Sequence, residues 1–121
     1  MKKVVIDPGH GGVDPGTISN GIVEKEYALK ISKYIKNRLD ELGIDNKITR
    51  TDDSTLDSNS RTKKIQSFYG DGKDVIVVSN HINAGGGDGA EIIYALRNND
   101  VFSSWGPLVV LLLPLRIEDF K

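Results

Sequence analysis

The sequence predicts an α/β domain in which a central, mostly parallel sheet is flanked by helices. Three observations carry this prediction: two short runs rich in β-branched residues, an amphipathic helical pattern between them, and turn residues that separate the segments. At 121 residues the chain has room for one domain. We assign that domain to residues 1–100 and regard 101–121 as an atypical apolar tail, so that the C-terminal part of the fold is expected to be truncated or atypical.

The first strand and the first helix have the clearest patterns. Lys3–Ile6 is a β-branched run that stops at Asp7-Pro8-Gly9, as expected of a buried strand that ends in a loop. The segment Glu24–Leu42 predicts an amphipathic helix that ends at Gly43. Its apolar residues recur at steps of three and four: Ala28, Ile31, Ile35, Leu39 and Leu42.

The next two elements have weaker patterns. Ile44–Thr49 is a strand candidate, and a second helix is expected to begin near Ser54 or Asp57 and to end at Gly70. This second helix should bury Leu56, Ile65 and Phe68.

The second half of the chain predicts a central strand and a shorter one. Asp74–Ser79 contains four consecutive β-branched residues, which is typical of a strand covered on both faces, and Ala90–Tyr94 is a further strand candidate. From Val101 onward there is neither helical nor clean strand periodicity. The apolar run Leu108–Leu113 must nevertheless be buried or associate with another surface.

Composition excludes several classes of function. Sixteen Lys and Arg against seventeen Asp and Glu give a net charge of -1, so no basic field predicts a nucleic-acid partner. The longest apolar run, six residues, is far shorter than the ~20 residues of a membrane-spanning helix. No cysteine is present, so histidines and carboxylates are the available ligands for a transition metal.

Both histidines of the chain follow predicted strands. His10 lies in the glycine-rich turn after the first strand, and His81 follows the central strand. Because the carboxyl ends of parallel strands meet at one edge of a sheet, the two imidazoles form a plausible pair of Zn²⁺ ligands. A third ligand should be a carboxylate, for which Glu24 and Glu26 are both candidates. The alternative role of either glutamate is a favourable charge at the helix N-terminus.

These motifs resemble the zinc-dependent N-acetylmuramoyl-L-alanine amidase family (amidase type 3), over residues 3 to 97. The similarity lies in the order and spacing of short motifs: Val4–Gly12, Asp14-Pro15-Gly16, Gly21, Glu24-Lys25-Glu26, Leu42-Gly43, Thr49–Asp52, Arg61, Ser79–Ala84, Gly89, Glu91 and Tyr94. The resemblance implies that His10, Glu24 and His81 hold Zn²⁺ and that peptidoglycan is the substrate. Glu26 is then left as the helix residue.

The resemblance does not supply a catalytic residue. The family carries a catalytic glutamate on a strand beyond the position of Tyr94, and Glu118 does not stand in such an apolar strand context. Ile65-Gln66 also stands where the family has an Ala-Asn pair. Asn83, two residues after His81, is expected either to orient substrate or a ligand, or to shape the loop.

Several alternatives remain open at this point. The chain could be an amidase-like domain that binds zinc and peptidoglycan without turnover, or a complete small amidase whose tail packs normally. An α/β domain with Pro8–Gly12 as a phosphate loop is weaker, because no phosphate-loop spacing is present.

Location and assembly give two further expectations. The start Met1-Lys2-Lys3 is not followed by the apolar region of a signal peptide. We therefore expect synthesis in the cytoplasm and action on the cell wall after lysis, as for a phage or prophage endolysin. The apolar tail also predicts self-association.

Overall fold

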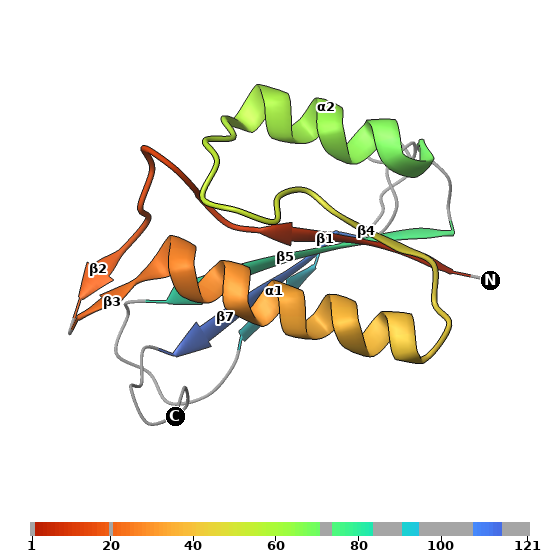
Figure 1. The fold of residues 1–121 in the computed structure, drawn as a ribbon, viewed down its shortest axis with the longest axis horizontal. Helices are drawn as coiled ribbons and strands as arrows, with labels where there is room; N and C mark the ends of the chain where they lie inside the picture. Colours follow the sequence, from red (N-terminus) through yellow and green to blue (C-terminus); the bar gives the residue numbers. More distant parts are fainter. Residues whose placement is uncertain (1, 20, 71–73, 84–90, 95–107, 115–121) are drawn as a thin grey trace.

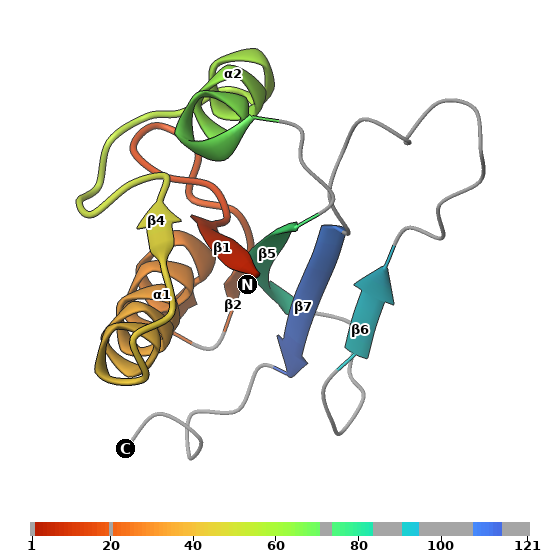
Figure 2. The same ribbon diagram turned by 90° about the vertical axis from the view of Figure 1, so that its right-hand side faces the viewer.

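The computed structural model describes residues 2–19, 21–70, 74–83, 91–94 and 108–114, with side chains up to residue 82. Its core is a five-stranded sheet (Figure 1), whose strand order β4-β1-β5-β7-β6 can be followed from left to right in Figure 2. The strands are β1 (Lys3–Pro8), β4 (Asn46–Ile48), β5 (Val75–Asn83), β6 (Glu91–Tyr94) and β7 (Leu108–Pro114). β1, β4, β5 and β7 run parallel, and β6 is antiparallel to β7.

Two helices cover opposite faces of this sheet, α1 (Glu24–Glu41) on one side and α2 (Ser58–Tyr69) on the other (Figure 2). α1 packs against β1, β4 and β5, and α2 packs against β1. The predicted α/β class, with a mostly parallel sheet flanked by helices, is therefore confirmed.

A local sequence signal marks the end of α1 and the start of α2. α1 ends at Glu41 with Leu42 as its C-cap residue, and Gly43 follows with a φ of 70°, a left-handed conformation that glycine adopts without steric cost. Asp57 caps α2 by accepting a hydrogen bond from the backbone N–H of Ser60.

The side chains of α2 are less buried than the sequence predicts. Ile65, Phe68 and Tyr69 pack as half-buried residues against a core cluster of Val5, Val75 and Val77. Ile65 and Phe68, which the sequence predicts to be buried, do face the core but are only half-buried, because α2 lies at the surface and covers only one face of the sheet. Leu56 is also half-buried and precedes the helix.

A small hairpin, which the sequence analysis did not anticipate, precedes α1. β2 (Ile18–Ser19) pairs antiparallel with β3 (Ile22–Val23), and Gly21 between them has a φ of 77°. The backbone N–H of Glu24 then donates to the carbonyl of Thr17. This hairpin fixes where the chain enters α1 and hence where Glu24 lies.

The apolar run near the C-terminus forms β7, an interior strand between β5 and β6. β7 pairs in parallel with β5 from Val77↔Leu108 to Asn83↔Pro114. The run has no clean strand periodicity and was therefore not predicted to be a strand; it forms one because a parallel strand covered on both faces reads as a continuous apolar run and not as an alternating one. In the part of the chain that the structure describes, no helix is long and apolar enough to span a bilayer.

Candidate metal centre

His10 lies two residues beyond the end of β1, in a turn whose backbone passes close to β5. A Cβ atom on Gly9 would lie 2.6 Å from Cε1 of His81, so only glycine lets the end of β1 pass so close to β5. His10 itself has a φ of 60°, and Gly11 and Gly12 also have positive φ. The turn therefore folds the imidazole of His10 back toward the neighbouring strand.

His81 lies within β5 and not after it, which corrects the sequence prediction. β5 runs on to Asn83 because β7 continues to pair with it beyond the end of β1. Pro8, the last residue of β1, is level with Asn80. The two histidines therefore still meet at the carboxyl end of β1, as expected, with their ring centroids 5.0 Å apart.

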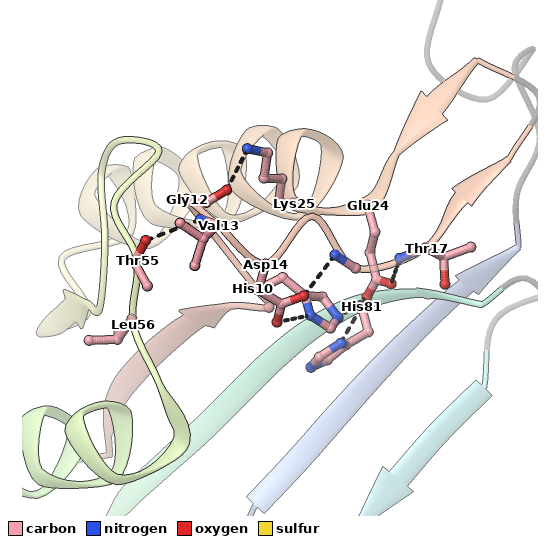
Figure 3. A network of polar contacts seen from close by, with 12 residues as sticks. His10, Gly12, Val13, Asp14, Thr17, Glu24, Lys25, Thr55, Leu56 and His81 are labelled. Carbon is pink, nitrogen blue, oxygen red and sulfur yellow. Dashed lines mark hydrogen bonds and ion pairs between the residues drawn. The ribbon is translucent and has the colours of Figure 1, made fainter.

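Glu24 is the first residue of α1 and lies between the two histidines (Figure 3). Its Oε2 atom is 2.8 Å from Nε2 of His10 and 2.9 Å from Nδ1 of His81. Its Oε1 atom accepts a hydrogen bond from the backbone N–H of Thr17. Glu26, the other carboxylate candidate, is exposed on α1.

The environment keeps Glu24 ionised. Burial raises the pKa of this carboxyl group, but the hydrogen bond from His81, the Thr17 N–H and the charge of His10 outweigh it and lower the pKa to about 2. A ligand already deprotonated at neutral pH can bind a cation without losing a proton first.

The three side chains offer a donor set that fits Zn²⁺. One ligand atom from each of His10, Glu24 and His81 lies within 4.8 Å of the other two. Two imidazoles and one carboxylate are a known donor set for catalytic zinc, and such sites leave a coordination position for water or substrate. A Cβ atom on Gly16 would come within 2.6 Å of His10 Cδ2 and 2.8 Å of Glu24 Oε1, so the chain wraps tightly around the site.

Asp14 holds the other nitrogen of the His10 ring. Nδ1 of His10 lies 2.8 Å from Oδ2 of Asp14, and the other Asp14 oxygen accepts from the backbone N–H of Gly16. The hydrogen bond from His10 lowers the pKa of Asp14. A carboxylate in this place fixes the ring orientation and leaves Nε2 facing Glu24. Sequence reasoning missed this role, although the spacing of four residues from His10 was a usable signal.

A buried polar cluster anchors the end of β1. Asp7, which is 4% exposed, accepts hydrogen bonds from Thr49, Ser79 and Arg61. Arg61 lies on α2, so a charged contact joins that helix to the strand from which the His10 turn leaves.

Two residues considered in the sequence analysis cannot be placed at the site. Asn83 is the last residue of β5, but its side chain lies outside the described residues, as does Glu118. The catalytic acid or base therefore stays unassigned.

Comparison with known proteins identifies the family of this chain. A profile of the N-acetylmuramoyl-L-alanine amidase family (Amidase_3) matches residues 4–105. The sporulation-specific N-acetylmuramoyl-L-alanine amidase of Bacillus subtilis is 38% identical over 93 residues, which are 75% of this chain but only 35% of that protein. The chain thus spans about a third of this relative's length.

Solved structures of similar proteins have the same fold. The N-acetylmuramoyl-L-alanine amidase of Clostridium difficile 630 aligns with a TM-score of 0.74 and 26% identity, covering 91% of this chain and 77% of that one. The catalytic domain of CwlV from Bacillus (Paenibacillus) polymyxa var. colistinus aligns with a TM-score of 0.73 and 25% identity, covering 93% and 79%.

Proposed function

Because this chain belongs to the N-acetylmuramoyl-L-alanine amidase family, we propose that it hydrolyses the amide bond between N-acetylmuramic acid and L-alanine in peptidoglycan with a Zn²⁺ ion held by His10, Glu24 and His81. The observation that carries the proposal is the convergence of these three ligand atoms within 4.8 Å. They come from the turn after β1, the start of α1 and the strand β5, so their convergence depends on how these three elements pack together.

The chain's own residues would prepare this reaction in two ways. Glu24, ionised and 4% exposed, supplies a negative charge that is already desolvated, and Asp14 orients His10. A bound Zn²⁺ ion supplies Lewis-acid polarisation of the scissile carbonyl and activation of water. Both carboxylates that contact the histidines are thus engaged in holding the site, and proton transfer is left to another group.

Because Glu24 and Asp14 are both used to hold the histidines, a second candidate function is also supported. An amidase-like domain that binds zinc and peptidoglycan without turnover needs the same three ligands but no proton-transfer group. The two functions differ only in hydrolysis, so one set of assays separates them.

The alternative of a phosphate loop at Pro8–Gly12 is not supported by the hydrogen bonds of the turn. A phosphate loop works because its backbone N–H groups point at the ligand. Here the N–H groups of Gly9, Gly11 and Gly12 donate to Asn80, Asp14 and Asp53.

The decisive experiment measures zinc and hydrolysis in the same preparation. We expect one Zn²⁺ per chain by elemental analysis, and loss of tight binding in His10→Ala and His81→Ala, with Glu26→Gln as an exposed acidic control. Amidase activity would release soluble stem peptides with a free N-terminal alanine from purified cell wall. Zinc binding without release favours the second function, and full zinc occupancy in both histidine variants contradicts the site.

We also propose, from the sequence, that the enzyme reaches the cell wall after lysis and that its C-terminal segment, residues 101–121, mediates self-association. Because β5 and β6 pair with both edges of β7, such a contact would use a face of the sheet and not an edge. Light scattering of the purified chain tests the second point, and a monomer across a concentration series would contradict it.

A further inference from the structure

Two arginines donate hydrogen bonds to the backbone of the turn that carries His10. Arg50 donates from Nε to the carbonyl oxygen of His10 at 2.9 Å and from Nη2 to that of Gly9 at 2.8 Å. Arg61 donates from Nη2 to the same His10 oxygen at 2.9 Å and from Nη1 to that of Pro8 at 2.8 Å. The His10 carbonyl is thus held from two sides by guanidinium groups.

The backbone at His10 is strained and needs such support. Among the described residues, His10 is the only non-glycine residue with a positive φ, at 60°. A side chain at this φ crowds the backbone, so the conformation persists only where its surroundings impose it. Holding the carbonyls of both Gly9 and His10 fixes the peptide planes before and after the His10 Cα atom, and so disfavours relaxation to negative φ.

Arg50 also connects the turn that carries His10 to the start of α1, which carries Glu24. Its Nη2 atom donates to the carbonyl of Lys25, the residue after Glu24, at 2.9 Å. Its Nη1 atom donates to the carbonyl of Asp52 at 3.0 Å. Together with its bonds to His10 and Gly9, Arg50 makes four hydrogen bonds, and all four acceptors are main-chain oxygens. The Arg50 side chain therefore stabilises the backbone and does not bind an anion.

The arrangement brings two cations together at a cost. Burial, and after it the positive charge of Arg61, lowers the pKa of Arg50. Asp7 offsets part of this repulsion, since one of its oxygens lies 2.6 Å from Nη1 of Arg61. The buried Arg50 and the half-buried Arg61 are tolerated side by side because the carbonyl oxygens of the turn accept their hydrogen bonds and Asp7 carries the opposite charge.

We propose that Arg50 and Arg61 are positioning residues, which clamp His10 in its left-handed conformation so that Nε2 faces Glu24 before any metal binds. The inference rests on the zinc site of the proposed function. The clamp makes the site preorganised, and its loss should weaken metal binding even in a folded chain.

The first test compares Arg50→Lys and Arg61→Lys with Arg38→Lys, a control on the exposed face of α1 where the arginine contacts Glu41. Lysine keeps the charge but cannot bond two carbonyls in a planar fork. Competition with a fluorescent chelator should show zinc affinity about 10- to 100-fold weaker in the two clamp variants. Circular dichroism of the metal-free proteins checks that they are folded. Wild-type affinity in both folded clamp variants would overturn the proposal.

A second test needs no variants. The intraresidue nuclear Overhauser effect between the amide and Cα protons of His10, measured by NMR in the wild-type chain, separates the two conformations, because a left-handed φ brings these protons closer together than a negative φ does. We expect the strong effect of a left-handed residue in the zinc-free chain and no change when Zn²⁺ is added. A weak effect until zinc is added would overturn the clamp, whereas a wild-type chain that binds no zinc would contradict the proposed function and leave the zinc-free measurement intact.

Discussion

The carboxylate of Glu24 is expected to make the metal-free domain acid-sensitive, and replacing it by glutamine should remove that sensitivity. The pKa of this group falls from 4.5 to about 2 in the folded chain. Because the folded-state pKa is the lower one, the unfolded chain takes up the proton first as the pH falls. The stabilisation is therefore complete above the unfolded pKa and is lost as the pH falls toward 2.

The size of the effect follows from the two pKa values. The difference between 4.5 and about 2 corresponds to about 3 kcal/mol of unfolding free energy at neutral pH. About 2 kcal/mol of this should be lost between about pH 5 and about pH 3. The side chain is only 5% exposed, so solvent screening reduces the value little.

Urea unfolding followed by circular dichroism, with EDTA present, measures this contribution. Wild type, Glu24→Gln and Glu26→Gln are compared at several pH values between about 3 and 7. The wild-type advantage over Glu24→Gln should shrink by about 2 kcal/mol over the acid range, while Glu26→Gln follows wild type. Parallel pH profiles for wild type and Glu24→Gln would refute the assignment of the low pKa to Glu24.

Two further substitutions probe the packing around the histidines. Gly16→Ala should abolish tight zinc binding, because its Cβ would press on His10 and Glu24; Gly43→Ala has a similar positive φ but open space around it, so chelator competition should show unchanged affinity there. Asp14→Ala should weaken zinc binding about 10-fold by freeing the His10 ring, and an isothermal titration with wild-type affinity would contradict the orienting role of Asp14.

Local sequence patterns were sufficient for most elements of the fold. The β-branched runs around Val5 and Val77 and the helical spacing after Glu24 each act within a few neighbouring residues, so periodicity located β1, β5 and α1. The turn residues Gly43 and Gly70 likewise placed the ends of both helices. The β2-β3 hairpin was not predicted, because its strands have only two residues each, which is too few for a periodic pattern to appear.

For the site, the sequence predicted the chemistry and the edge of the sheet. With two histidines and no cysteine, the metal-binding donor types were fixed by composition, and the strand endings brought His10 and His81 to one edge. The choice of Glu24 over Glu26 came from family resemblance alone, and the structure brings Glu24 to the histidines.

The sequence by itself thus determined both helices, the strands β1, β4, β5 and β6, and the atoms that could bind a metal, because propensity, periodicity and donor type are properties of short stretches. Only the tertiary structure decided that β7 lies inside the sheet, that Asp14 orients His10, and that Arg50 and Arg61 clamp it. The two arginines reach the His10 carbonyl across 40 and 51 residues of chain. Contacts at such separations depend on strand register and helix placement, which no local pattern encodes.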